Sequence, residues 1–192
     1  MKCAAARVVA VAATFVTVMT VGACRASSHD DAGSRPDTSI TVGSAHSTED
    51  VRFLQDMVGH HGQAVELAAL VGDHSSDPRL NALAQQIDAE QRVEVYGFQA
   101  QLLQWEAPPA AGDDAGMVGL VDRATMAKLA ALHGAAFEKL WLQSMIEHHR
   151  GAITMAQSEI ADGQSPDVVG IAQSVAATQQ AAIDRMNELV VG

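Results

Sequence analysis

Residues 53–68 read FLQDMVGHHGQAVELA, and residues 141–156 read WLQSMIEHHRGAITMA. The second stretch begins 88 residues after the first (141 − 53), and the two agree best at a methionine followed by a pair of histidines. An internal repeat is the most important feature to identify in a sequence, because it determines the architecture of the fold. Paired histidines are uncommon, and composition alone does not account for two pairs that each follow a methionine at the same spacing.

The same offset relates residues well beyond the histidines, so the repeated unit is about 50 residues long. A unit of that length with helical periodicity corresponds to two helices. The following pairs are each 88 residues apart: Pro78 and Pro166, Gln85 and Gln173, Ile87 and Val175, Gln91 and Gln179, Phe98 and Met186.

Capping residues and apolar periodicity predict where the helices lie. Ser47 and Asp50 form a capping box that begins a helix, which we expect to end at Gly72. Asp77 caps a second helix that runs to about residue 105. A linker over residues 106–119 then precedes the second half of the chain.

The second half repeats the arrangement of the first after one short helix. The predicted helices cover about residues 122–132, 135–161 and 166–190, and strand patterns are absent from the sequence. The fold class is therefore all-α: a four-helix bundle built from two repeated helical hairpins (about residues 47–105 and 135–190), plus one short extra helix. The bundle domain spans residues 47–192.

The first 23 residues have the layout of a secretory signal. Lys2 and Arg7 precede an apolar run, and small residues at 21–23 lead directly to Cys24. This order is typical of a bacterial lipoprotein, in which the thiol of Cys24 carries the lipid and becomes the new N-terminus. An ordinary signal peptide or a single membrane anchor are the alternatives, although the apolar run is short for a membrane-spanning helix.

Residues 24–46 are rich in Ser, Asp, Gly and Thr, which predicts a flexible tether between the lipid and the domain. Cleavage before Cys24 would leave a single cysteine, so neither an internal disulfide nor a thiolate metal site is expected. It would also leave 10 Lys and Arg (12 − 2) against 23 acids, a net charge of −13. That charge argues against nucleic acid as a partner. The expected location is the extracytoplasmic side of the cell membrane, and the sequence does not identify a protein partner.

The two histidine pairs lie on the inner faces of two predicted helices. Met57 precedes His60 and His61 by three and four residues, which places its thioether beside both rings on a helix. Met145, His148 and His149 repeat the arrangement. Buried polar side chains need partners, which leaves two interpretations open. The histidines form a hydrogen-bonded core network with Gln91 and Glu94, or they bind a metal that these groups and Gln179 help to orient.

Ligand type distinguishes between metals. Thioether with imidazole suits copper, and Cu(I) in particular, because the methionine sulfur is soft. Carboxylate-bridged di-iron bundles use a Glu-x-x-His motif, which this chain lacks, and structural zinc usually requires cysteine. We therefore expect copper and no organic cofactor.

The segment from Glu138 to Ala156, with Met145, His148, His149, Gly151, Ala152 and Met155, resembles the pattern of the Domain of Unknown Function 305 family. The resemblance covers about residues 49–190. It implies a ferritin-like four-helix bundle, and some members are extracytoplasmic copper binders. It also adds Met155 to the candidate ligands Met57, His60, His61, Met145, His148 and His149.

The chain departs from this pattern at two positions. Ala182 stands where the first repeat has Glu94, and Leu67 stands where the second repeat has Met155. If both groups matter, neither repeat is complete. The two halves are then unequal, or one site is shared between them.

Three function classes follow from the sequence. The leading hypothesis is a lipid-anchored, non-enzymatic metal-binding protein that stores, buffers or delivers copper outside the membrane. The second is a metal-dependent oxidoreductase. The absence of a Glu-x-x-His motif argues against this hypothesis, and the sequence predicts no catalytic residue. The third is a structural or interaction module of the envelope, in which the histidines are core hydrogen-bonding groups.

Overall fold

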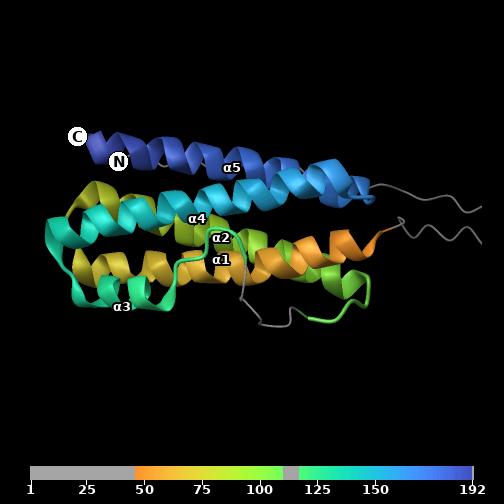
Figure 1. Cartoon of the computed structure of the whole chain (residues 1–192), viewed down its shortest axis with the longest axis horizontal. Helices are drawn as coiled ribbons and strands as arrows, with labels where there is room; N and C mark the ends of the chain where they lie inside the picture. Colours follow the sequence, from red (N-terminus) through yellow and green to blue (C-terminus); the bar gives the residue numbers. More distant parts are fainter. Residues whose placement is uncertain (1–45, 110–116, 192) are drawn as a thin grey trace, which may run out of the picture. The chain divides into compact units, whose positions relative to one another are not determined.

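The computed structural model describes residues 46–109 and 117–191, and within these ranges the chain is helical without a β-strand. The predicted all-α bundle of four long helices with one short extra helix is confirmed (Figure 1). The predicted signal peptide, Cys24 and the tether up to residue 45 lie outside the described residues. In chain order the helices are α1 (Thr48–His74), α2 (Pro78–Gln104), α3 (Arg123–Ala131), α4 (Gly134–Asp162) and α5 (Pro166–Val191).

The bundle consists of two antiparallel hairpins, α1–α2 and α4–α5, which correspond to the two sequence repeats. The hairpins meet mainly through α1 and α4, and α2 touches α5 less extensively. α1 and α4 run in opposite directions (Figure 1). An approximate twofold axis perpendicular to the bundle therefore exchanges α1 with α4 and α2 with α5. The short α3 contacts both α1 and α4.

The predicted capping box at the start of α1 also joins this end of the bundle to α5. The backbone amide of Asp50 donates to Ser47 Oγ, and the Asp50 carboxylate accepts from the amide of Ser47. The other oxygen of the Asp50 carboxylate accepts from the amides of Gln164 and Ser165, each at 3.0 Å. The fully buried Asp50 thus joins the N-terminus of α1 to the turn between α4 and α5.

The end of α1 differs from the prediction, since the helix does not stop at Gly72 but continues to His74. Two contacts hold this last turn. His74 Nδ1 donates to the carbonyl of Leu132 at 2.6 Å, and its ring stacks on those of His133 and Phe137. Tertiary packing therefore outweighs the weak helix preference of Gly72.

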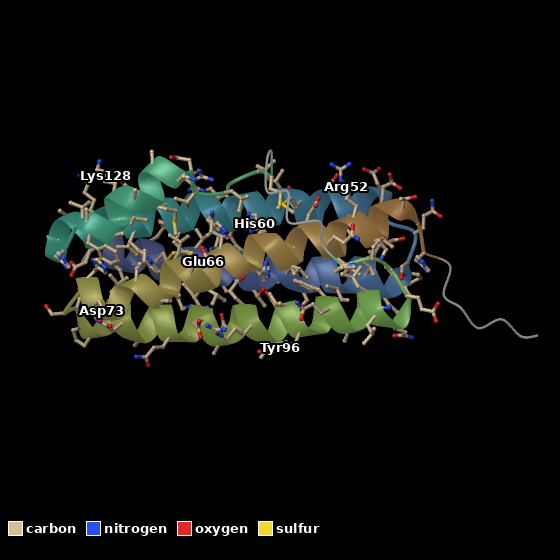
Figure 2. All side chains as sticks on the ribbon, turned by 90° about the horizontal axis from the view of Figure 1, so that it is seen from below. Arg52, His60, Glu66, Asp73, Tyr96 and Lys128 are labelled. Atoms are coloured by element: carbon tan, nitrogen blue, oxygen red, sulfur yellow. The ribbon has the colours of Figure 1, made fainter. Side chains whose placement is uncertain are left out.

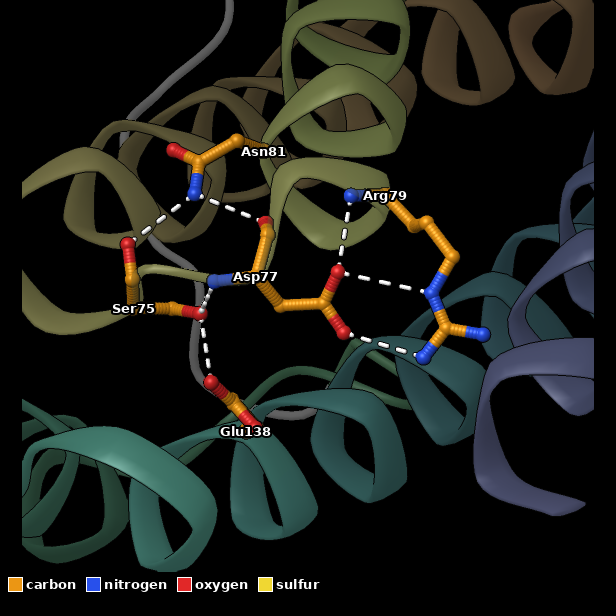
Figure 3. Close-up of polar contacts among 5 residues, drawn as sticks. All are labelled: Ser75, Asp77, Arg79, Asn81 and Glu138. Carbon is orange, nitrogen blue, oxygen red and sulfur yellow. Dashed lines mark hydrogen bonds and ion pairs between the residues drawn. The ribbon is translucent and has the colours of Figure 1, made fainter. Parts of the chain in front are cut away.

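The turn between α1 and α2 is fixed to α4 by side-chain hydrogen bonds (Figure 3). Ser75 Oγ donates to Glu138 Oε1 at 2.6 Å and accepts from the amide of Asp77 at 3.1 Å. Asn81 donates to the carbonyls of Ser75 and Asp77, and Arg79 pairs with the Asp77 carboxylate at 3.1 Å. The bond from Ser75 to Glu138 joins this turn to α4, and the other bonds hold the turn itself.

The apolar core is split into two clusters along the bundle. One includes Leu67, Leu129 and Trp141, and the other includes Leu54, Phe98 and Val168. Polar side chains lie between the clusters on all four long helices, and they form the candidate site. Among the helices of the described residues, none is both long and apolar enough to cross a membrane.

Candidate metal centre

Four buried histidines occupy the middle of α1 and α4. His60 and His61 are 0% exposed, and His148 and His149 are 1% exposed. Figure 2 shows His60 near the middle of α1. The rings of His60 and His148 lie 3.9 Å apart between centroids, at 38° to each other, where the approximate twofold axis crosses the α1–α4 interface. The structure therefore brings together the two pairs that the sequence singled out, and we refer to the four residues as the histidine layer.

The histidine layer lies at the level where each long helix passes from one apolar cluster to the other. Gln91 on α2 and Gln179 on α5 are both buried, at 3% and 2% exposure, at the same break between the clusters. Met57 belongs to one cluster and Met145 to the other, and both side chains are fully buried. The two predicted thioether ligands thus lie on opposite sides of the histidine layer.

The histidines of the first repeat each have one partner. His60 Nε2 lies 3.1 Å from the carbonyl oxygen of Val118, and His61 Nε2 lies 2.7 Å from Glu94 Oε2. Both partners accept hydrogen bonds, so each Nε2 carries the proton and each Nδ1 offers a lone pair. The second oxygen of Glu94 accepts from Thr178 Oγ1 at 3.1 Å, which fixes the carboxylate between α1 and α5. Glu94 therefore orients His61, which both the core-network and the metal interpretation of the sequence expect of it.

The histidines of the second repeat have no hydrogen-bond partner at either nitrogen. For His149, the counterpart of His61, the reason lies in the sequence, because Ala182 stands where the first repeat has Glu94. Together with Nδ1 of His60 and Nδ1 of His61, six buried ring nitrogens are unpartnered. Each buried polar atom without a partner costs on the order of 1–3 kcal/mol. A core network would normally avoid such a cost, whereas a metal ligand must keep its lone pair free.

Lowered pKa values keep the rings of His60, His148 and His149 neutral. Burial lowers the pKa of His60 to about 4 and that of His149 to about 3, and repulsion between the neighbouring rings adds to the effect. Burial also lowers the pKa of His148 well below its ordinary value. Metal binding needs the neutral imidazole, so protons do not compete for these rings at neutral pH.

A segment that sequence reasoning missed crosses over the histidine layer. Residues 117–121, here called the crossing segment, place the Val118 carbonyl against His60 and are held by Gln63, whose side chain bonds Val121 through both its oxygen and its nitrogen. A Cβ atom added at Gly151 would lie only 2.1 Å from the Val118 carbonyl oxygen, so the approach requires glycine there. Gly119, with φ at 85°, passes over Gly151. A glycine in the middle of α4 was the available sequence signal.

Met155 lies apart from the histidine layer. It follows His149 by six residues, which is about 9 Å along a helix axis. It is half-buried and lines a surface cavity of about 320 Å³, together with Met117 and Val118 of the crossing segment. Its counterpart Leu67 is fully buried in the other half of the molecule.

The donor set in the histidine layer consists of imidazoles and thioethers. Within residues 46–109 and 117–191, no three side chains of His, Cys, Asp and Glu are placed to hold one metal ion together. An ion in the histidine layer would therefore need a methionine sulfur beside the imidazoles, or a rotation of the rings. Met57 and Met145 each lie within one helical turn of a histidine pair, which suits a soft ion.

Comparison with known proteins identifies the family. The sequence profile of the family described as "Domain of unknown function (DUF305)" matches residues 50–190. The chain belongs to the DUF305 family. Two solved DUF305 structures, from Streptomyces coelicolor and Deinococcus radiodurans, are each 31% identical to it, with TM-scores of 0.68 and 0.70. They cover 74% and 75% of this DUF305 protein, which in turn covers 92% and 96% of theirs.

CopM, solved in a Cu(II)-bound form, shares the fold of this DUF305 protein with a TM-score of 0.63 at 24% identity. The match covers 73% of this chain and 94% of CopM. CopM has also been solved in Cu(I)-bound, Ag-bound and apo forms. No curated protein matches the sequence.

Proposed function

We propose that this DUF305 protein binds copper in the histidine layer and serves in its storage, buffering or delivery, without catalysing a reaction. The observation that carries the proposal is the set of six unpartnered ring nitrogens on four fully buried histidines. Such nitrogens are costly in a core that has no other use for them. Copper-bound forms of CopM, a protein of the same fold, support copper as the ion.

The residues present fit copper chemically. His148 and His149 have both nitrogens free, and His60 and His61 offer Nδ1 because Nε2 is already bonded. Imidazole binds both oxidation states of copper, and a thioether favours Cu(I). Met57 or Met145 would supply the sulfur from either side of the layer. The ion would find neutral rings at His60, His148 and His149, and Glu94 would hold the ring of His61 in place through Nε2.

The remaining polar groups would serve the ligands rather than the ion. Gln91 Oε1 is buried without a partner, and Gln179 is buried at the corresponding position of α5. Both are positioned to orient imidazole rings by hydrogen bonding once the rings turn toward an ion.

The location belongs to the same proposal. We place the domain on the extracytoplasmic face of the cell membrane, held by lipid on Cys24 through the tether of residues 24–46. The Streptomyces coelicolor relative carries the description of a secreted protein, which agrees with export. A copper-binding domain at the membrane surface would receive or supply copper ions outside the cell.

One alternative has an observation in its favour. His60 and His61 each make a hydrogen bond, and within the described residues no three His, Cys, Asp or Glu side chains are placed around one point. These facts fit a structural or interaction module whose histidines set the register of the bundle. The four free nitrogens of His148 and His149 count against it.

Copper content separates the two functions. The full-length chain, purified in detergent without a histidine tag, is incubated with Cu(I) or Cu(II), desalted and analysed for metal. We expect a fixed stoichiometric amount of copper, and its loss when His60, His61, His148 and His149 are all replaced by Gln. A wild-type chain without copper, or a four-Gln variant that retains the same amount, would favour the structural module.

A further inference from the structure

The approximate twofold axis divides the groove between α1 and α4 into two related halves, one on each side of the histidine layer. α3 lies over one half and contacts both helices (Figure 1). Leu129 of α3 is fully buried there, in the same apolar cluster as Leu67 and Phe137. The other half contains the 320 Å³ cavity that Met117 and Met155 line. We call them the covered half and the open half.

The sequence repeats differ in polarity at the positions that line these halves. At four of these positions the residue on the covered half is apolar and belongs to, or packs against, the cluster that contains Leu129 of α3, whereas its counterpart 88 residues away lines the cavity and is polar. In each of the following pairs the open-half residue comes first: Glu49 and Phe137, Arg52 and Leu140, Ser158 and Leu70, Glu159 and Val71. The open half therefore does more than lack a helix equivalent to α3. Its lining is polar at these positions and suits a polar or charged ligand.

The charge of the open half favours a cation. The carboxyl groups of Glu49, Asp56 and Asp162 line the cavity, against the single guanidinium of Arg52. Glu159 adds a fourth carboxyl group, which burial keeps protonated at neutral pH by raising its pKa to about 8. Arg52 lies 3.6 Å from Asp56 and is mostly exposed, so it neutralises one acid at most. A cleft lined by one sign of charge raises the local concentration of ions of the opposite sign.

Two further observations indicate which cation the cavity suits. Glu159 is 4% exposed, lines the cavity, and its Oε1 has no hydrogen-bond partner. The thioethers of Met117 and Met155 come from two different elements to the same cavity. Methionine sulfur selects soft ions such as Cu(I) over the hard cations that carboxylates alone would bind.

The cavity and the histidine layer share one wall. Val118 lines the cavity, and its carbonyl oxygen is the atom that bonds His60 Nε2. Val118 belongs to the crossing segment, which lies directly against Gly151 on α4. Displacement of this one segment would connect the open half to the buried nitrogens.

We propose that the open half is a loading site, where Met117 and Met155 bind Cu(I). The carboxyl group of Glu159 is the third ligand and releases its proton to solvent as the ion binds. The ion then passes beneath the crossing segment into the histidine layer. This inference rests on the proposed copper function, and it adds a second, weaker site with a different ligand set. Among the residues that the structure describes, α3 and its apolar cluster occupy the corresponding positions of the covered half, so loading proceeds from the open half.

Methionine methyl resonances test the loading site directly. The full-length four-Gln variant, labelled with ¹³C at the methionine methyl groups, is titrated with Ag(I) as a diamagnetic soft ion. We expect the Met117 and Met155 methyl signals to shift first, while that of Met126, a half-buried methionine of α3 on the covered half, stays in place. Equal shifts of all three, or no shift at Met117 and Met155, would overturn the proposal whether or not the histidine layer binds copper.

Loading kinetics provide the second test, with the histidines intact. In the full-length Met117→Leu/Met155→Leu variant, which lacks both thioether ligands, and in Glu159→Gln, which lacks the carboxyl ligand, the rate of Cu(I) uptake should fall by about tenfold, the lower end of the 10–100-fold that the loss of a group supporting a metal site costs. The final copper content should equal that of the wild type, and Met126→Leu is the matched control. An uptake rate equal to that of the control would contradict a loading site, whereas a lower final content would place these residues in the storage site instead.

Discussion

The imidazole rings of His60 and His148 lie 3.9 Å apart between centroids although the residues are 88 positions apart in the chain. They are equivalent positions in the two repeats, so the approximate twofold axis relates one ring to the other. Yet their hydrogen bonding differs, since His60 donates to the Val118 carbonyl and His148 has no partner. The two repeats therefore bring their histidines into one shared and asymmetric cluster at the α1–α4 interface.

The crossing segment should be sensitive to the side chain at Gly151. In Gly151→Ala the new Cβ would meet the Val118 carbonyl oxygen at 2.1 Å and Gly119 Cα at 2.7 Å, so the segment must shift. Overpacking of this kind costs about 1–3 kcal/mol of unfolding free energy. Denaturant unfolding measures it. Gly170→Ala is the control, because a Cβ there meets nothing within 4 Å, and it should raise stability by about 0.5–1 kcal/mol.

The buried methionines should affect the two oxidation states of copper differently. Met57→Leu combined with Met145→Leu should weaken Cu(I) binding more than Cu(II) binding, because thioethers prefer the softer ion. Leucine nearly matches methionine in volume, so the stability cost should stay below about 1.5 kcal/mol per site. Competition with chelators specific for each oxidation state measures both affinities. Equal weakening of the two would remove methionine from the ligand set.

The carboxyl pair at the start of α1 should make stability depend on pH. Burial raises the pKa of Glu159 to about 8, and the carboxyl of Asp50 adds to this effect. Burial also disfavours the charged form of Asp50, but hydrogen bonds from Ser47 and Ser165 outweigh it and lower the pKa of Asp50 to about 2. At neutral pH, the carboxyl group of Glu159 is therefore protonated, whereas that of Asp50 is ionised.

Between the ordinary pKa of 4.5 for glutamate and about 8, the folded state binds one proton more at Glu159 than the unfolded chain does. The unfolding free energy should therefore fall as pH rises through this window. In Glu159→Gln, whose amide cannot ionise, that contribution should be absent. Thermal unfolding of both proteins across the window gives the difference, from which the histidine titrations common to both cancel. A difference that stays constant with pH would show that Glu159 ionises normally in the folded protein.

Membrane attachment should depend on Cys24. Each methylene of an acyl chain that is buried in the bilayer contributes about 0.8 kcal/mol, so several chains anchor a protein firmly. Cys24→Ser should either release the protein from membranes or leave its signal uncleaved. Fractionation of cells and the mass of the product measure both. A variant that is cleaved and still fully retained on the membrane would contradict lipid attachment.

The sequence predicted the site's main residues because a repeat and helical periodicity are local signals. Met57, His60 and His61 share a helix, so their spacing alone placed them together, and the 88-residue offset implied the second set. The same offset showed that Ala182 replaces the counterpart of Glu94. That substitution proved to explain why His149 has no partner.

Features that depend on contacts between distant segments could not be predicted in the same way. Gly72 marked a helix end by local preference, but stacking of His74 on residues of the second hairpin carried α1 one turn further. The contact between the Val118 carbonyl and His60 is made by a loop that carries no recognisable sequence motif. Only Gly151, in the middle of α4, indicated where this loop lies. Met155 matched the family pattern, yet its place in a surface cavity follows from where α3 and the crossing segment lie.

The most direct test is the position of copper in crystals of the protein, located by anomalous scattering at the copper absorption edge. The account predicts a peak between α1 and α4, within bonding distance of imidazole nitrogens from His60, His61, His148 or His149. Replacement of these four residues by Gln should remove that peak and leave a helical bundle, at a cost of about 1–3 kcal/mol per site. Copper found only on surface groups such as His46 or His133, with the buried rings unchanged, would contradict the account.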